Sequence, residues 1–255
     1  MGQVSTFRAA ERELPGERQG RVDLAAAFRL AVLHDWHEAV ANHFSLAISD
    51  DGKTFLMNRR WVHFSSIRAS DLLRLHADDA EAMQGPDAPD PSAWCIHGAI
   101  HAALPQARCI LHVHSAYATA LCGLADPEIK PIDQNTARFF RRVAIDRDYG
   151  GIADTQDEGA RLVRALGDKQ VMLMGNHGVL VAAPTVADAY DTLYYLERAC
   201  RTLVLAYSTG QPLGAMPDHL AEQTARGWEA YRDSRFAHFD EMKRQLDRQD
   251  SGYAE

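Results

Sequence analysis

The sequence has no apolar run long enough to cross a lipid bilayer. Val179–Ala183 is one of its longest uninterrupted apolar stretches, whereas a membrane-spanning helix needs about 20 such residues. The first twenty residues are polar and charged and lack the apolar core of a secretory signal, so we expect residues 1–20 to form a mobile tail. These absences exclude an integral membrane protein, and we expect no membrane partner.

The sequence has few cysteines and no Cys-x-x-Cys pair. Its four cysteines are scattered, and three of them lie inside apolar stretches, where a reduced thiol behaves as a small buried hydrophobic group. This usage is typical of a reducing compartment, so we expect a cytoplasmic protein. The four are Cys95, Cys109, Cys122 and Cys200.

An excess of positive charge is also missing, since the formal net charge is −8. A nucleic-acid partner usually requires a concentrated basic face, so we expect none. Arg138, Arg141 and Arg142 form the only tight basic cluster, which we interpret as a solvated helix face or a contact with an acidic surface.

The composition is that of a folded globular protein, with 46% hydrophobic and 24% charged residues in a chain of 255. We expect one domain over residues 21–250. Apolar residues recur at helical spacing over Val22–Ala41, alternate over Asn42–Met57 as in a hairpin, and predict helical turns over Ala69–Leu75.

The rest of the chain alternates between short strands and helices. The expected elements are a helix Trp94–Leu104, a strand Cys109–His114, a helix Ala116–Leu124, a strand Val143–Ile145, a break at Gly150-Gly151, a helix Asp157–Leu166, two strands over Val171–Ala182, a helix from Pro184 to Tyr207 and a long helix His219–Leu246. Brief strands linked by hairpins favour a mixed or antiparallel sheet flanked by helices.

Three histidines are candidate metal ligands. His112 and His114 stand two apart in the expected strand and therefore share one face of it. His177 lies in an Asn-His-Gly turn between two apolar strands. Three neutral imidazoles suit zinc, iron(II), cobalt or nickel and leave positions for water or substrate. The alternative is that these are core or surface histidines with backbone partners.

His97 and His101 form a rival pair, because a spacing of four places both on one helix face. The same spacing occurs in the His-Glu-x-x-His helix of zinc proteases, but Gly98 stands where the glutamate base would be. We therefore favour packing and hydrogen-bonding roles for both, with His101 near the pocket.

The segment WCIHGAIHAALPQARCILHVH (Trp94–His114) resembles the class II aldolase/adducin family. Further matching segments are NHFSL from Asn42, LGDKQVMLMGNHGVLV from Leu166, YYLERAC from Tyr194 and the terminal LDRQDSGY. The likeness covers about residues 20 to 250 and is closer to the adducin-like branch than to the sugar-phosphate aldolases.

This resemblance implies an α/β fold, a three-layer α/β/α sandwich with a central, mainly antiparallel sheet. It also implies a homotetramer with sites at subunit interfaces and one divalent ion, zinc by expectation and iron(II) as the alternative. His112, His114 and His177 match the family's metal ligands. In the aldolases the metal acts as a Lewis acid during cleavage of a carbon–carbon bond.

Two departures from the aldolase pattern matter. Ala93 stands in place of the aldolase glutamate, and Asn58-Arg59-Arg60-Trp61 replaces the phosphate loop. We expect Asn42 and Ser92 to make polar contacts with the substrate, and Arg59 or Arg60 to pair with a carboxylate.

Ordinary sugar-phosphate aldolase chemistry is therefore doubtful, and three functions stay open. The first is a metal-dependent lyase, of aldolase or decarboxylase type, for a small hydroxy- or oxo-acid or a sugar-derived substrate. His101, His43, Tyr117 or a metal-bound water would then move the proton. The second is a non-haem iron oxygenase for oxidative decarboxylation. The third is a non-catalytic, adducin-like assembly module.

Overall fold

The computed structural model describes residues 13–85, 88–148 and 156–255. The helices are α1 (Glu17–Leu33), α2 (Pro91–Ala103), α3 (Ala116–Cys122), α4 (Gln134–Ala137), α5 (Gln156–Leu166), α6 (Val186–Ser208), α7 (Asp218–Ala230) and α8 (Asp233–Gln249). The strands are β1 (His43–Ala47), β2 (Thr54–Met57), β3 (Leu73–His76), β4 (Cys109–Val113), β5 (Val143–Asp146), β6 (Val171–Met174) and β7 (Gly178–Ala183).

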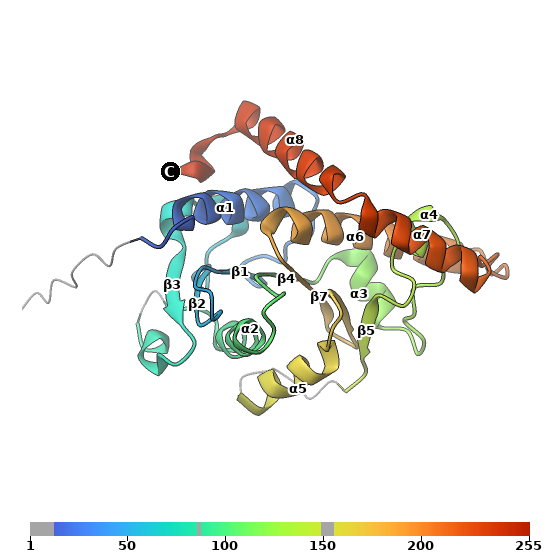
Figure 1. The fold of residues 1–255 in the computed structure, drawn as a ribbon, viewed down its shortest axis with the longest axis horizontal. Coiled ribbons are helices and arrows are strands. Elements are labelled where there is room, and N and C mark those ends of the chain that lie inside the picture. The colour runs from blue at the N-terminus through green and yellow to red at the C-terminus, as the bar shows by residue number, and fades with distance from the viewer. Residues whose placement is uncertain (1–12, 86–87, 149–155) are drawn as a thin grey trace, which may run out of the picture.

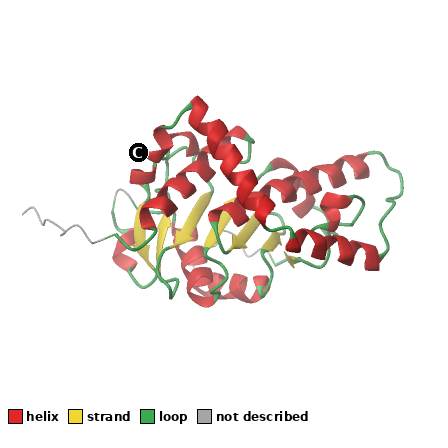
Figure 2. Ribbon diagram, turned by 45° about the horizontal axis from the view of Figure 1, so that its top comes forward, coloured by secondary structure: helices red, strands yellow, loops and turns green. Residues whose placement is uncertain are grey.

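Within these ranges the strands form one seven-stranded sheet in the order β3-β2-β1-β4-β7-β6-β5. Every neighbouring pair is antiparallel except β5 and β6, which are parallel. Helices α1, α6 and α8 lie on one side of the sheet and α2 and α5 on the other (Figure 1). Figure 2 shows the strands enclosed between these helices. The expected three-layer α/β/α sandwich with a mainly antiparallel sheet is confirmed.

The two faces of the sheet bury different clusters. The central strand β4 is buried along its whole length, because both faces are covered. Leu111 and Val113 face the apolar core beneath α1 and α6, whereas Ile110 faces the smaller core beneath α2 and α5. His112 alternates with Leu111 and Val113, so its ring lies on the α2 side of the sheet.

Helix α2 begins where the sequence supplies an N-cap. The Asp90 carboxylate accepts hydrogen bonds from the backbone N–H groups of Ser92 (3.0 Å) and Ala93 (3.4 Å), and Pro91 occupies the first turn. Both are favoured at a helix start, because the first N–H groups have no partner inside the helix. The helix thus starts three residues before the expected Trp94.

Helix α1 differs from its expected bounds at both ends. It begins at Glu17, inside the stretch expected to be a tail, and it ends at Leu33 rather than at Ala41. The chain reverses at Asp35, whose φ is 57°, and brings Trp36 back so that its N–H donates to the carbonyl oxygen of Ala31.

Two other expectations were wrong. The expected helical turns over Ala69–Leu75 are a short 3₁₀ turn, Ala69–Asp71, followed by β3, which pairs with β2 at the edge of the sheet. The expected continuous helix His219–Leu246 is broken between α7 and α8. This break lets Arg232 and Arg235 both reach the buried Asp188. The expected Gly150-Gly151 break lies outside the described residues.

The four cysteines are free thiols, and three of them are buried. Among the described helices, none combines the length and apolarity that a bilayer span requires.

Candidate metal centre

Pairing between β1 and β4 places two histidines side by side. His43 is the direct partner of His112 in this antiparallel register, and their rings stack with centroids 4.8 Å apart. His114 follows at the end of β4. His177 comes from the turn between β6 and β7, and its ring centroid lies 4.8 Å from those of both His112 and His114.

The three expected metal ligands therefore converge. One ring nitrogen of each of His112, His114 and His177 lies within 4.8 Å of the others, and this is the group of metal-ligating side chains found among the described residues. The Nε2 atoms of His112 and His114 are 3.1 Å apart. Two nitrogens that share a tetrahedral or octahedral ion lie about 2.9–3.4 Å apart, given metal–nitrogen bonds of about 2.05 Å.

The hydrogen bonds of the other ring nitrogens fix which nitrogens have free lone pairs. His112 Nδ1 lies 3.0 Å from the carbonyl oxygen of Val179, and His114 Nδ1 is hydrogen-bonded to the carboxylate of Glu38. Both oxygens accept, so both Nδ1 atoms carry the proton and both Nε2 atoms present lone pairs. A carboxylate or carbonyl behind a histidine is the usual support of a metal ligand. This donor set fits a divalent ion.

The Asn-His-Gly turn allows the start of β7 to lie close to the end of β4. Asn176 has a φ of 54°, a left-handed conformation that asparagine tolerates better than most residues. At Gly178 an added Cβ would lie 2.5 Å from Cδ2 of His114 and 2.6 Å from the carbonyl oxygen of Val113. Only glycine therefore lets β7 start this close to β4.

Burial keeps His112 and His177 neutral. Desolvation lowers the pKa of His177 to about 4, and a protonated His114 would lower it further. Desolvation also holds the pKa of His112 well below its ordinary value. Neutral imidazoles are the form that binds metal.

A second group of polar side chains forms a continuous hydrogen-bonded chain that begins at His43, next to His112. His43 Nδ1 lies 2.7 Å from His97 Nε2, and His97 Nδ1 lies 2.5 Å from Ser45 Oγ. Ser45 Oγ lies 2.7 Å from His101 Nε2, and His101 Nδ1 lies 2.6 Å from the carbonyl oxygen of Ala107. We call His43, His97, Ser45 and His101 the histidine relay.

The carbonyl at the end of the histidine relay sets the direction of every hydrogen bond in it. Because a carbonyl only accepts, His101 donates from Nδ1 and its Nε2 accepts from Ser45. Ser45 then accepts from Nδ1 of His97, whose Nε2 accepts from Nδ1 of His43. Desolvation lowers the pKa of His43 and of His101 to about 4, so both rings are neutral. His43 is left with an unprotonated Nε2.

His43 lines a cavity of about 160 Å³ together with the three candidate ligands, His112, His114 and His177, and we call it the metal cavity. Three of the expected substrate contacts, Asn42, Arg60 and Ser92, line it as well. Asn42 is only 7% exposed, and neither atom of its side-chain amide has a partner among the described residues. The Nε of Arg60 is also buried without a partner. These unsatisfied groups are suited to a polar ligand.

The other expected site residues lie elsewhere in the single chain. Arg59 forms an ion pair with Asp71 at 3.4 Å and lines a separate hollow. His101 is at the far end of the histidine relay and is 3% exposed. Tyr117 lies on α3, where its backbone N–H donates to Glu197. None of these three side chains lines the metal cavity, so their roles stay predictions.

Sequence reasoning missed several residues at the site. Glu38, the partner of His114, is 76 positions away, and no local pattern indicates it. The side-chain amide of Asn58 binds the backbone on both sides of His43, at Asn42 and Phe44, and thereby holds that segment. Asp90 was detectable as the N-cap residue before Pro91, and it also lines the cavity. Ala93 is fully buried in an apolar cluster and contributes no acid.

Solved and curated proteins resemble this chain over most of its length. An aldolase II superfamily protein from Pseudomonas syringae has a crystal structure with a TM-score of 0.87 and 33% identity, covering 96% of this chain and 98% of that one. A "putative aldolase class 2 protein" from Caulobacter vibrioides is 31% identical over 88% of this chain and 87% of its own length.

A third relative, from Streptomyces roseochromogenus, is named 4-hydroxy-3-prenylphenylpyruvate oxygenase/4-hydroxy-3-prenylbenzoate synthase. It is 27% identical over 76% of this chain and 72% of its own length. The family model described as the class II aldolase and adducin N-terminal domain matches residues 22–204, which is most of the chain. Together with the fold, this match shows that the chain belongs to the class II aldolase and adducin family.

Proposed function

We propose that this protein is a metal-dependent lyase that breaks a carbon–carbon bond, by aldol cleavage or decarboxylation, in a small hydroxy- or oxo-acid. One observation carries the proposal: three histidine nitrogens converge in a cavity that His43 also lines. A divalent ion at His112, His114 and His177, zinc in the first instance, supplies a Lewis acid that polarises an oxygen of the substrate.

Residues around the ion are suited to an acid substrate. The Arg60 guanidinium pairs with a carboxylate, while the unpartnered amide of Asn42 and the hydroxyl of Ser92 orient a neighbouring hydroxyl or carbonyl group. The cavity of about 160 Å³ limits the substrate to a few carbon atoms beside the ion unless a further subunit extends the site.

His43 is the proton-transfer residue in this proposal. In aldol cleavage its Nε2 takes the proton from the substrate hydroxyl as the carbon–carbon bond breaks, and it returns that proton to the carbon left behind. Decarboxylation releases no such proton, so in that reaction a water molecule supplies it. The histidine relay keeps Nδ1 of His43 protonated and bonded to His97, so the ring cannot present the wrong tautomer. In this proposal His101 acts as the anchor of the relay and does not touch the substrate.

The test combines metal analysis with turnover. Protein purified without added metal is analysed for bound ions and then assayed with a panel of short hydroxy- and oxo-acids. We expect one bound ion per chain and release of an aldehyde, ketone or carbon dioxide without oxygen uptake. The variant His43→Gln should keep its metal and lose at least about a hundredfold in kcat. Full activity of His43→Gln would contradict its role.

An iron oxygenase is the second candidate, favoured by the relative whose printed name is that of an oxygenase with an oxo-acid substrate. A three-histidine site without a carboxylate ligand is compatible with this reaction as well. An oxygen electrode separates the two: iron with substrate-dependent oxygen uptake excludes the lyase, whereas zinc without oxygen uptake excludes the oxygenase.

We also propose that the chain works in the cytoplasm as a homotetramer. Trp61 supports assembly, because it lines the metal cavity and is 69% exposed in the single chain, where a neighbouring subunit would cover it. Light scattering coupled to size exclusion measures the mass directly, and a monomer would rule this proposal out. A tetramer that folds fully without metal and turns over no acid would point instead to an adducin-like assembly module.

A further inference from the structure

A second cavity lies at the other end of the β6–β7 hairpin. It has a volume of about 570 Å³, and its basic lining residues outnumber its acidic ones, Asp168, Asp188 and Glu229. The basic residues are Arg138, Arg141, Arg142, Lys169, Arg232 and Arg235. We call this second cavity the arginine cavity. Its wall contains Val171, the first residue of β6, and Pro184, which directly follows β7. The metal ligand His177 lies in the turn at the opposite end, about 17 Å away by strand length.

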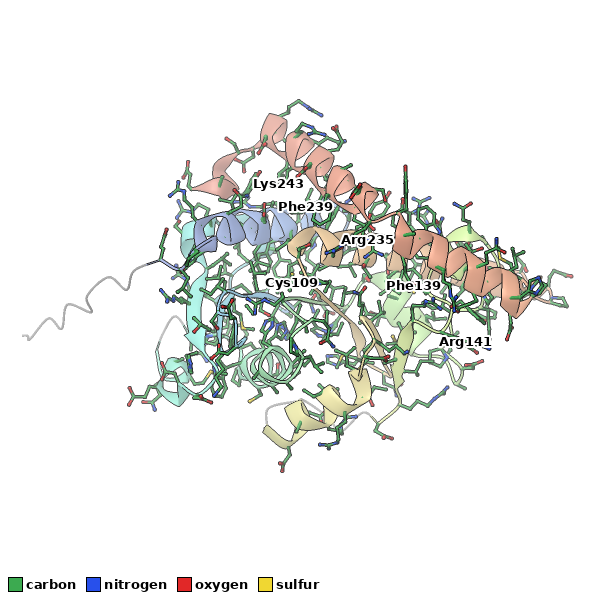
Figure 3. All side chains as sticks on the ribbon, viewed as in Figure 1. Cys109, Phe139, Arg141, Arg235, Phe239 and Lys243 are labelled. Atoms are coloured by element: carbon green, nitrogen blue, oxygen red, sulfur yellow. The ribbon has the colours of Figure 1, made fainter. Side chains whose placement is uncertain are left out.

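The arginine cavity is lined by segments that lie far apart in the sequence. Figure 3 labels Phe139 and Arg141, in the segment that follows α4, and Arg235, near the start of α8. Arg138, Arg141 and Arg142, interpreted from the sequence as a solvated helix face or a contact with an acidic surface, thus help to line a cavity.

The charges around the buried carboxylates Asp188 and Asp191 do not balance. Arg232 and Arg235 both bind the carboxylate of Asp188, at 2.7 Å and 3.4 Å. Arg138 binds Asp191, whose other oxygen is 2.8 Å from Nδ1 of His238. Three guanidinium groups therefore meet two carboxylates, which leaves one positive charge in excess in a chain whose formal net charge is −8.

Two of these guanidinium groups also have unused donors. The side chain of Arg138 is 6% exposed, and its Nη1 is buried without a hydrogen-bond partner among the described residues. The Nε of Arg235 is buried without a partner as well. Burial lowers the pKa of Arg138, Asp191 opposes that effect, and Arg235 adds to it by repulsion. A buried donor with excess positive charge is costly unless an anion completes it.

We propose that the arginine cavity is a binding site for a small phosphorylated molecule, separate from the metal centre. Arg138, which follows α4, and Arg232 and Arg235, at the start of α8, bring several N–H donors to one cavity, and a phosphate group, with more acceptor oxygens than one planar carboxylate, can use more of them. The indole of Trp228, which lines the cavity 5.2 Å from the Arg138 guanidinium carbon, offers an apolar wall for the rest of the molecule.

Calorimetry on the metal-loaded protein in low-chloride buffer tests the site, with inorganic phosphate as the probe and succinate as the carboxylate comparison. We expect saturable binding of one phosphate per chain, tighter than succinate and weaker at high ionic strength. Binding should change the tryptophan fluorescence, and this signal should vanish in Trp228→Phe while the calorimetric signal remains.

Variants separate the arginine cavity from the metal centre. Arg235→Met should weaken phosphate binding at least tenfold and keep the bound metal, and it leaves Asp188 paired with Arg232. Arg138→Lys, which keeps a charge beside Asp191, should also weaken it. The matched control is Arg198→Met, an exposed arginine on the same helix as Asp188, which should bind phosphate within twofold of the wild type.

Three outcomes would overturn the proposal. They are no binding to the wild type at 10 mM phosphate (about the upper range of a specific small-anion site), equal binding by Arg235→Met, and succinate binding as tightly as phosphate. None of these outcomes affects the proposed lyase, which is measured by metal content and turnover.

Discussion

The metal cavity and the arginine cavity lie at opposite ends of the β6–β7 hairpin. Their buried polar groups are stabilised in opposite ways. At the metal centre, burial lowers the pKa of His112 and His177 and so removes charge. The hydrogen bonds of His112 and His114 leave lone pairs on two Nε2 atoms that lie 3.1 Å apart. Around Asp188 and Asp191 the charges persist, and guanidinium groups surround them with donors to spare. The first arrangement is suited to a cation and the second to an anion.

The largest effect should come from removing a metal ligand. His114→Ala should abolish stoichiometric metal binding, because only two imidazoles remain, while the fold persists because this side chain is 23% exposed. Elemental analysis and circular dichroism measure the two effects. Glu38→Gln should keep the ion but bind it about 10- to 100-fold more weakly. One full equivalent of metal in His114→Ala would refute the assignment.

A buried ion pair should give the next largest effect. Arg138→Met leaves Asp191 buried with only His238 beside it, which should lower the free energy of unfolding by about 3–5 kcal/mol. The matched control is Arg141→Met, whose pair with Asp218 is 66% and 73% exposed, and it should cost at most about 1 kcal/mol. Urea unfolding measures both, and equal losses would remove the distinction between buried and exposed pairs.

Breaking the histidine relay should cost less. Ser45→Ala leaves His97 Nδ1 and His101 Nε2 without partners, so the free energy of unfolding should fall by about 1–3 kcal/mol. The bound metal should remain, and kcat should fall more than KM rises. Ser65→Ala removes an exposed serine–histidine bond and serves as the control. An unchanged stability of Ser45→Ala would mean that the hydroxyl carries no hydrogen bonds in solution.

Lowering the pH should reduce the free energy of unfolding by a smaller amount, through the histidine relay and not through the arginine cavity. The pKa of His101 is lowered by burial from 6.5 to about 4, so the unfolded chain binds a proton there that the folded chain does not. The stabilisation is present above pH 6.5 and is lost as the pH falls from 6.5 toward 4, by about 1.4 kcal/mol per pH unit for each such histidine.

Urea unfolding of metal-free protein between pH 7 and pH 5 measures this slope. Arg138→Met should keep the slope, because guanidinium groups do not titrate in this range, and His101→Gln should reduce it. A stability that stays flat between pH 6.5 and pH 5 would show that the relay histidines are hydrated rather than buried.

Local patterns in the sequence predicted the features that depend on local rules. The period of two in β4 put His112 and His114 on one face, and the Asn-His-Gly turn pointed to His177. Short strands alternating with helices predicted a mixed or antiparallel sheet flanked by helices, whereas the three-layer sandwich was implied by the family resemblance. These signals are readable because each depends on residues only a few positions apart.

Features that depend on distant partners were not predictable in this way. The segment Leu73–His76 becomes a strand because β2 offers it an edge to pair with, and its Leu-Arg-Leu-His alternation is too short to predict a strand by itself. The break after Ala230 has no glycine or proline to mark it and follows from ion pairs to Asp188. The contact of His43 with His97 joins positions 54 residues apart, so the histidine relay appears only in the folded chain.

The pairing of His43 opposite His112 has a consequence for how this protein matures. A slip of one residue between β1 and β4 would send His43 to the opposite face of the sheet, so no partly paired intermediate offers the complete pocket. The complete pocket, with His43 beside the three histidines, is therefore a late product of folding. Metal uptake requires instead that β4 pairs with β7, which brings His177 to His112 and His114, so following uptake during refolding would time that step without any added label.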